Sequence, residues 1–253
     1  MRDVQVYASG VIAGSAGGGS GSVDSSTVVR WAVSADGPAA HVDPANWWVD
    51  ELGVAQLVGA TRSAVTGSVH GASVAFAERP GIAAGCDAIV TDHPNLALVT
   101  LAADCVPVVL ADPHCGLVAA VHCGWQGLTV GVVSEAVRVM VQRGARAITA
   151  VVGPSICATC YPVDDDRLER VRNSVAPSVA AEACLDDPAR IAVAAGVVAE
   201  LHSLREIGVQ RIDQVPGCTA QDPRLFSFRD SGTMNRHAMV VAAFHDGDIP
   251  EST

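Results

Sequence analysis

A cysteine and a histidine, Cys105 and His122, lie at the outer ends of two apolar runs that a short turn connects. Residues 103–110 and 117–122 are rich in Val and Ala, which favours strands, and residues 111–116 contain the Asp-Pro and Gly typical of a turn. An antiparallel hairpin centred on this turn pairs position 110 with 117 and position 105 with 122. Directly opposed side chains share one face, with Cβ atoms about 5 Å apart. The spacing therefore predicts that the thiol of Cys105 meets the imidazole of His122.

Two kinds of chemistry fit this pair. A thiolate and an imidazole at this separation can bind one zinc ion, with bonds of about 2.3 and 2.1 Å. The same two groups can also work without a metal, as a cysteine nucleophile activated by a histidine base. Cys105 and His122 are the candidate catalytic residues under both interpretations.

The elements that must position this pair are strands and helices in mixed order. The sequence predicts an α+β fold with a mixed sheet, because helices and strands intersperse without a strict strand–helix–strand rhythm and at least one hairpin is present. The other expected strands cover 65–76 (interrupted by Gly67 and Gly71), 88–91, 97–101, 148–152 and 238–244, and the expected helices cover 43–53, 128–143 and 190–208. Residues 1–29 are expected to form a partly flexible N-terminal segment, with a Gly/Ser-rich loop over 9–26, ahead of a catalytic domain over 30–253.

Composition excludes several classes of function. The 253 residues, 49% of them hydrophobic, suffice for a sizeable core in one or two domains. A net charge of −11 argues against a nucleic acid or an anionic membrane as the main partner. All 16 basic residues are arginine, which excludes Schiff-base catalysis and a phosphate-loop lysine.

The eight cysteines are irregularly spaced, and residues 1–7 contain no apolar signal-type segment. We therefore expect a cytoplasmic protein in which most cysteines are small core residues. Cys157 and Cys160 form a Cys-x-x-Cys motif, but no second pair completes a four-thiolate zinc site, so we expect ordinary core or loop cysteines there. Cys115 and Cys123 are not expected to bind metal.

Short motifs in a fixed order give the chain a family resemblance, and they are His70-Gly71, Cys86-Asp87-Ala88-Ile89-Val90-Thr91, Ala103-Asp104-Cys105-Val106-Pro107-Val108, Val121-His122-Cys123-Gly124-Trp125-Gln126-Gly127, Gly153-Pro154-Ser155-Ile156 with Cys160-Tyr161, Cys218-Thr219 and Phe226-Ser227-Phe228-Arg229. With these motifs the chain resembles the laccase-domain (multicopper polyphenol oxidase-like) family, which is associated with purine nucleoside phosphorylase and adenosine deaminase activity. The resemblance covers roughly residues 40–245 and is most specific over 86–127.

The resemblance implies a single-domain α/β/β/α sandwich of mixed β-sheets. It also implies a Zn²⁺ ion held by His70, Cys105 and His122; copper is a possible occupant because it binds such ligands more tightly in the usual affinity order. The implied substrates are a purine nucleoside and phosphate. We expect no nucleic-acid or membrane partner, and a monomer or homodimer.

The chain departs from the family pattern in four places. Gln126 replaces an arginine, Asn46-Trp47 replaces an Asn-Arg helix start, and Ser68 replaces a glutamine. The N-terminal Thr-Thr-Arg-type segment of the family is not recognisable in residues 9–26. Arginines grip anions with two parallel hydrogen bonds, so these changes bear on phosphate binding more than on metal binding. The chain is thus expected to be a diverged paralogue.

The remaining site candidates have two interpretations each. Asp104 either orients a ligand imidazole as part of the catalytic set or caps a strand. Asp87 either binds the nucleoside or carries a proton. The turn at Gly153 either receives an anion on its backbone amides or is a plain turn. The candidate substrate contacts are Asp87, Gln126, Gly153, Ser227 and Arg229, of which Arg229 is equally a structural arginine.

Three protein ligands would leave a fourth zinc position open, as in catalytic sites. A water there, acidified towards a pKa of about 7, could attack C6 of adenine and expel ammonia. In phosphorolysis, phosphate instead attacks the anomeric carbon of the ribose and the base departs with a proton. We therefore predict a zinc-dependent purine nucleoside enzyme.

Three other functions are alternatives to the zinc-dependent nucleoside enzyme. A copper-dependent phenol oxidase typically uses His-x-His pairs, and the eight histidines contain none. A diverged paralogue with lost or recruited activity, and a metal-free cysteine hydrolase, are the other two.

Overall fold

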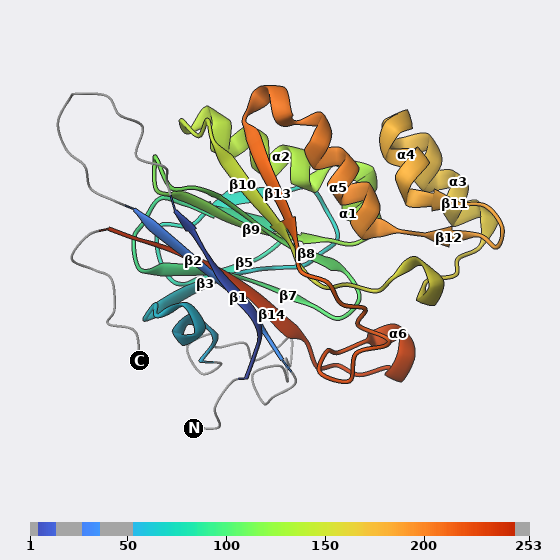
Figure 1. Ribbon diagram of the computed structural model, residues 1–253, viewed down its shortest axis with the longest axis horizontal. Helices are drawn as coiled ribbons and strands as arrows, with labels where there is room; N and C mark the ends of the chain where they lie inside the picture. The colour runs from blue at the N-terminus through green and yellow to red at the C-terminus, as the bar shows by residue number, and fades with distance from the viewer. Residues whose placement is uncertain (1–4, 14–26, 36–52, 246–253) are drawn as a thin grey trace.

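Two six-stranded mixed sheets, packed face to face, form the centre of the molecule (Figure 1). The computed structural model describes residues 5–13, 27–35 and 53–245. The first sheet has the order β13-β10-β8-β9-β6-β4, with β13 Val209–Gln214, β10 Ile148–Val152, β8 Val106–Asp112, β9 Leu117–Cys123, β6 Ala88–Thr91 and β4 Val74–Phe76. The second has the order β1-β2-β14-β7-β3-β5, with β1 Val6–Ala13, β2 Val28–Ser34, β14 His237–Phe244, β7 Leu96–Ala102, β3 Arg62–Thr66 and β5 Gly81–Ala83.

Side chains that alternate along the strands create the layers. On β8, Val109 and Ala111 join the core between the two sheets, whereas Val108 and Leu110 face the helices on the outside. A strand buried on both faces needs such a continuous apolar run, which is why residues 106–111 contain no charged side chain.

Helices cover the outer face of the first sheet. The covering helices are α1 Trp125–Val130, α2 Val132–Gln142 and α5 Val193–Ser203 (Figure 1). The shorter elements around them are η4 Ala158–Cys160, α3 Asp165–Ser174, α4 Pro177–Ala183, β11 Cys184–Leu185, β12 Arg190–Ile191, η5 Arg205–Ile207 and α6 Phe228–Ser231. The 3-10 helix η3 Val54–Val58 packs its buried residues on the outer face of the second sheet. The expected α/β/β/α sandwich is confirmed, with η3 as the outer layer on that side among the described residues.

Two helix predictions had the wrong boundaries. The expected helix over 128–143 begins earlier, at Trp125, and is broken into α1 and α2 at Gly131, whose φ of 70° lies in the left-handed region and ends the first helix. The expected helix over 190–208 is reduced to α5, because β12 precedes it and the separate 3-10 turn η5 follows it.

The expected strand over 65–76 is wrong in a way that matters for the site. Its two ends belong to different sheets, β3 in the second and β4 in the first. The connecting residues 67–73 pass from one sheet to the other, and two of them, Ser68 and His70, have positive φ angles that no regular strand accommodates. His70 thus lies on a crossing segment rather than on a strand.

The N-terminal region also differs from expectation. Residues 9–13 belong to β1, which pairs with β2, so the expected loop over 9–26 is wrong for these five positions and its remainder lies outside the described residues. The expected domain boundary at residue 29 falls inside β2, which is hydrogen-bonded to β14. The expected helix over 43–53, with Asn46-Trp47, lies outside the described residues except for Gly53. No helix in the described part of the chain has the length and apolar character to cross a membrane.

Candidate metal centre

The hairpin that carries Cys105 and His122 is present, but its register differs by two positions from the predicted one. His122 faces Pro107, and Asp112 faces Leu117. The turn is therefore tighter than expected, because β8 continues to Asp112 and leaves only residues 113–116 to reverse the chain. Since side chains alternate with a period of two, a two-residue shift keeps Cys105 on the same face as His122, as its diagonal neighbour.

That shared face looks towards the second sheet. His122 has the parity of Val118 and Ala120 on β9, and Cys105 has the parity of Val109 on β8, and these apolar residues belong to the core between the sheets. The candidate centre therefore lies at the edge of the apolar core between the sheets, next to solvent.

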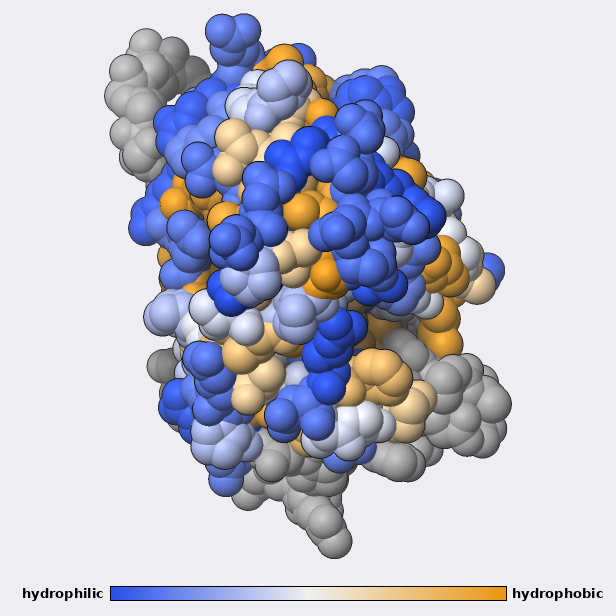
Figure 2. Space-filling model, turned by 90° about the vertical axis from the view of Figure 1, so that its right-hand side faces the viewer, coloured by the Kyte–Doolittle hydropathy of each residue, from blue (hydrophilic) through white to orange (hydrophobic). Residues whose placement is uncertain are grey.

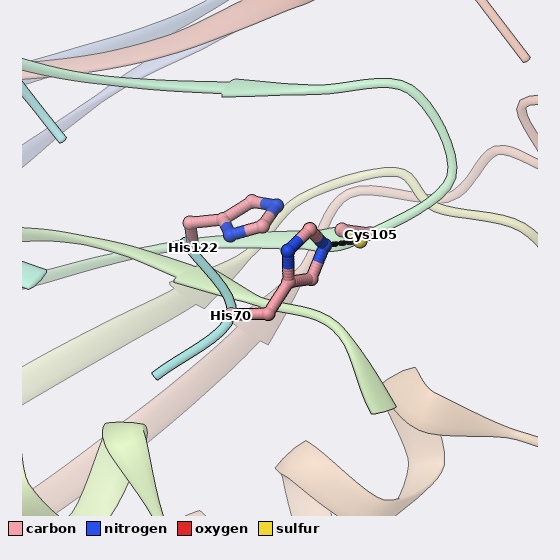
Figure 3. A group of neighbouring side chains, drawn as sticks. All are labelled: His70, Cys105 and His122. Carbon is pink, nitrogen blue, oxygen red and sulfur yellow. Dashed lines mark hydrogen bonds between the residues drawn. The ribbon is translucent and has the colours of Figure 1, made fainter. Parts of the chain in front are cut away.

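His70 completes the group from the crossing segment 67–73 (Figure 3). Its Nε2 lies 3.8 Å from Sγ of Cys105, and its ring stands edge-on to that of His122, with centroids 5.0 Å apart at 77°. One ligand atom from each of the three residues falls within 4.8 Å of the others. The three predicted metal ligands are thus brought together from three separate segments.

The geometry of this group fits a tetrahedral zinc ion. Bonds of about 2.3 Å to sulfur and about 2.1 Å to nitrogen place two tetrahedral ligand atoms about 3.6 Å apart. The observed 3.8 Å between His70 and Cys105 matches this separation and is too long for a strong hydrogen bond. Exposure rises across the set, from buried His122 through half-buried Cys105 to exposed His70, so the group is open on one side.

Gly124, directly after β9, leaves the space that the ligands use. A Cβ atom at this position would lie 2.9 Å from Sγ of Cys105 and 3.0 Å from Cδ2 of His70. Both distances are shorter than ordinary carbon contacts, so a side chain here would displace two of the three candidate ligands.

The carboxylate of Asp87 holds two of the candidate ligands, His122 and His70, in place. It is fully buried, and its Oδ1 accepts a hydrogen bond from Nδ1 of His122 at 3.0 Å and from the amide of His70 at 2.8 Å. Its Oδ2 accepts from the amide of Gly71 at 2.7 Å. The Asp87 bond leaves Nε2 of His122 as the nitrogen free to bind a metal, an arrangement typical of carboxylate–histidine–metal sites.

Charges on these groups depend on one another. Burial alone would raise the pKa of Cys105, but His122 and His70 lower that pKa to about 6. Burial alone would lower the pKa of His122, but Asp87 and Cys105 raise it to about 9. Burial would likewise raise the pKa of Asp87, and His122 with the two backbone amides holds it below its usual value. The thiol of Cys105 is therefore poised to ionise, as a metal ligand must.

Both aspartates use their carboxylates within the protein. Asp87, predicted to bind the nucleoside or to carry a proton, is 0% exposed, and both of its oxygens accept hydrogen bonds from protein groups. Asp104, predicted to orient a ligand imidazole or cap a strand, accepts instead from Thr219 Oγ1 and from the amide of Arg229, each at 2.7 Å. Asp104 thus fixes the chain just before Cys105 to the C-terminal loops.

The other predicted substrate contacts are scattered. Gln126 is exposed on α1, beyond Gly124. The amide of Gly153 donates to the carbonyl of Pro107 at 2.8 Å, so this amide already has a partner within the protein. Ser227 is buried and caps α6, where its hydroxyl accepts from the amide of Asp230. Ser227 also lines a surface hollow with Thr219, Asp222 and Phe226.

Two arginines lie near the centre. The guanidinium of Arg229 donates to the carbonyl of Pro162 and sits 5.1 Å from the ring of Tyr161, so part of it is structural. Arg236, which the sequence reasoning missed, is half-buried at the start of β14 and donates to the carbonyls of Thr233 and Asn235. Burial lowers the pKa of Arg236, and the charges of Cys105 and Asp104 raise it. In the described part of the chain no carboxylate forms an ion pair with Arg236. A basic residue close after the Phe226–Arg229 motif was its only signal in the sequence.

The fold and this centre together define an α/β/β/α sandwich with a His/Cys/His metal-type site at the open end of one sheet. The chain belongs to the multi-copper polyphenol oxidoreductase laccase family, whose model matches residues 39–243.

Its relatives include two bacterial proteins named purine nucleoside phosphorylase. The one from Streptomyces coelicolor is 43% identical over 178 residues, which cover 68% of this chain and 72% of that protein. The one from Mycobacterium tuberculosis is 35% identical over 205 residues, which cover 79% of this chain and 80% of that protein.

Solved structures share the fold. The hypothetical protein YfiH of Bacillus licheniformis superposes with a TM-score of 0.70 at 22% identity, covering 85% of this chain and 92% of that one. YlmD of Geobacillus stearothermophilus gives a TM-score of 0.69 at 23% identity, covering 86% and 92%.

Proposed function

We propose that this chain is a zinc-dependent purine nucleoside phosphorylase that acts on adenosine- or inosine-type nucleosides. The observation that carries the proposal is the convergence of His70, Cys105 and His122, with Asp87 behind His122, at an open edge of the sandwich. The names of the relatives support the same reaction class.

The candidate ligands suit Zn²⁺ in number and in kind. His70, Cys105 and Nε2 of His122 would hold the ion, which when bound supplies a Lewis acid beside the reacting groups. Asp87 keeps Nδ1 of His122 protonated, so that Nε2 points to the ion in a single tautomer. The low pKa of Cys105 keeps its sulfur available as a thiolate near neutral pH.

Phosphate would be bound by arginine on the C-terminal side of the centre. Arg236 is the better candidate than Arg229, because its guanidinium is half-buried and close enough to Cys105 for the two charges to interact, whereas the Arg229 guanidinium is exposed and lies against Pro162 and Tyr161. A half-buried guanidinium that forms no direct ion pair among the described residues gains from a dianion, since its fork matches two phosphate oxygens. Arg236 thus offers a replacement for the arginine that is absent at Gln126.

The reaction balances without further reactants. An oxygen of hydrogen phosphate forms a bond to C1′ of the ribose while the bond from C1′ to N9 breaks and its electrons pass to the base. The proton of the hydrogen phosphate ends on the departing base. The products are the free base and ribose 1-phosphate. Deamination of adenosine, the alternative for the same centre, consumes water and releases inosine and ammonia.

The experiment is a metal analysis combined with a nucleoside assay. Purified protein is expected to contain zinc and to convert adenosine or inosine, in the presence of phosphate, into base and ribose 1-phosphate. Chromatography of the products separates phosphorolysis from deamination. Cys105→Ala is expected to abolish turnover and lower the zinc content, whereas Cys115→Ala, at an exposed position in the hairpin turn, is expected to retain both.

Zinc-loaded protein that converts neither nucleoside would refute the proposal. Oxygen uptake with a phenol by copper-loaded protein would assign an oxidase instead. Stabilisation in a thermal-shift screen by non-nucleosides alone would assign a recruited, different function.

A further inference from the structure

Three thiols gather on the loops beside the candidate metal centre, outside the His70, Cys105 and His122 set. Cys157 precedes the single turn of η4 and Cys160 is its last residue, and Cys218 comes from the loop after β13. One sulfur from each falls within 4.8 Å of the other two. All three cysteines are half-buried and free. Cys157 and Cys160 lie on a loop rather than in the core, which is one of the two placements expected for them.

The backbone holds these sulfurs together before any ligand binds. Ser155 and Cys218 form a parallel β-bridge, and the amide of Thr219 donates to the carbonyl of Ser155 at 3.2 Å. The amide of Cys157 donates to Sγ of Cys218 at 3.3 Å. The two loops are thus tied at the point where the thiols meet, and little ordering would be needed to bind an ion.

Hydrogen-bond donors surround the sulfurs in the manner of thiolate metal sites. Nε2 of Gln221 donates to Sγ of Cys160 at 3.3 Å, and Oγ1 of Thr159 lies 3.0 Å from Sγ of Cys157. Donors of this kind stabilise negative charge on sulfur.

We propose that Cys157, Cys160 and Cys218 form a second metal site, which takes a thiophilic cation of the Zn²⁺ or Cu⁺ class. Three thiolates select such soft or borderline ions over Mg²⁺ and Ca²⁺, which require oxygen ligands. The Cys-x-x-Cys turn supplies two ligands at the usual spacing, and Cys218 supplies the third from a distant segment.

The location gives the ion a positioning role. The amide of Ile156 donates to the carbonyl of Asp104 at 3.0 Å, and Thr219 donates to its carboxylate. Both residues are next to a proposed ligand, Cys157 and Cys218 respectively. An ion between these loops would hold Asp104, and so the start of the strand that carries Cys105.

The test is the zinc stoichiometry of reduced protein, stripped of metal and titrated with Zn²⁺ under anaerobic conditions. Wild type is expected to bind two equivalents, and the double variant Cys157→Ser/Cys160→Ser one. Cys105→Ser is also expected to bind one, which separates this site from the proposed catalytic one. The matched control Cys86→Ser, at a half-buried cysteine outside both groups, should bind two. A parallel titration with Cu⁺ distinguishes the two ions.

A second measurement uses the wild type alone and is unaffected if a variant misfolds. After two equivalents of Zn²⁺, alkylation mapped by peptide mass spectrometry should spare Cys157, Cys160 and Cys218 while exposed Cys115 is modified. A single equivalent in wild type that the double variant retains would overturn the proposal. Equal alkylation of the three cysteines with and without either ion would overturn it as well.

Discussion

At the scale of single residues, the centre depends on a carboxylate that never meets solvent. The two carboxylate oxygens of Asp87 accept hydrogen bonds from three donors, the imidazole of His122 and the amides of His70 and Gly71. It therefore fixes the ring of one candidate ligand and the backbone of another. A buried charge of this kind is maintained only because both oxygens find donors.

Replacing Asp87 by Asn is expected to weaken zinc binding about 10- to 100-fold. The amide retains a single acceptor oxygen, so at least one of the three donors loses its partner and the His122 tautomer is no longer fixed. Competition with a chromophoric chelator, in the Cys157→Ser/Cys160→Ser background, measures this one site. Asp213→Asn, a change in a partly exposed ion pair with Arg211, is the control and should leave affinity unchanged. Equal affinity of Asp87→Asn and wild type would contradict the assigned role.

At this scale the sequence predicted the candidate ligands but not the residues that position them. His70, Cys105 and His122 were found by their types and motifs, because a metal requires those atoms and few others. Asp87 and Asp104 were both predicted as site residues, but Asp87 rather than Asp104 bonds the imidazole of His122, because which carboxylate reaches it depends on the pairing of β6 with β9. Arg236 was missed because nothing in its local sequence indicates that β14 begins near Cys105.

At the scale of elements, the connection from β9 to α1 decides whether the ligands fit. His122 is the second-last residue of β9, and α1 begins at Trp125. Gly124 between them must therefore pass within contact distance of both Cys105 and His70. The start of α1 and the candidate ligands are so close that only a residue without a side chain fits between them, and Gly124 is that residue.

Gly124→Ala is expected to reduce nucleoside turnover about 100-fold, because ligand shifts of about 1 Å have effects of that size. The backbone at this position is extended, with φ of −82°, so alanine itself causes no strain and the effect must come from contact with the ligands. Kinetic assays with adenosine or inosine, supported by zinc analysis, measure the effect.

Gly144→Ala provides the comparison, since a Cβ there meets nothing within 4 Å and only its φ of +109° is unfavourable. That variant should lose about 1 kcal/mol of stability and keep its activity. Similar activities of the two variants would show that Gly124 does not shape the centre.

The boundaries of the strands and helices show which structural features the sequence pattern predicts and which it does not. Strands 88–91 and 148–152 were predicted to the residue because β-branched runs between polar turns leave little choice. The helix break at Gly131 was not, since an apolar periodicity continues through it and only the left-handed φ reveals the interruption. The hairpin register failed for a similar reason: Asp112 looks like a turn residue, yet its carboxylate accepts from the amides of His114, Arg146 and Ala147 and lets β8 continue.

At the scale of the whole molecule, apolar side chains packed between the layers of the sandwich stabilise the fold, and charged side chains lie mostly on the surface. The face seen in Figure 2 is mostly hydrophilic, with apolar side chains in small scattered groups. The core between the sheets is built almost entirely from aliphatic side chains. His237, the first residue of β14, is an exception with 0% exposure and the same strand parity as Met239 and Val241, which belong to that core.

His237 is expected to make folding stability fall as the pH drops from 6.5 to 4. Burial lowers the pKa of this histidine to about 4, against 6.5 for the free side chain, and the charge of Arg236 lowers it further while Asp104 opposes the shift. Between these two pH values the unfolded chain binds a proton that the folded chain does not, so unfolding is favoured as the pH falls; above pH 6.5 neither state is protonated and the effect vanishes. The shift corresponds to about 3 kcal/mol in total.

The test is urea unfolding measured between pH 6.5 and 4. The stability of His237→Leu, which cannot be protonated, should lack this part of the decline, and the stability of His114→Ala, at an exposed site, should decline as that of wild type does. Parallel stability curves for His237→Leu and wild type would mean that the buried ring does not sense pH, and that the acid sensitivity of the sandwich arises elsewhere.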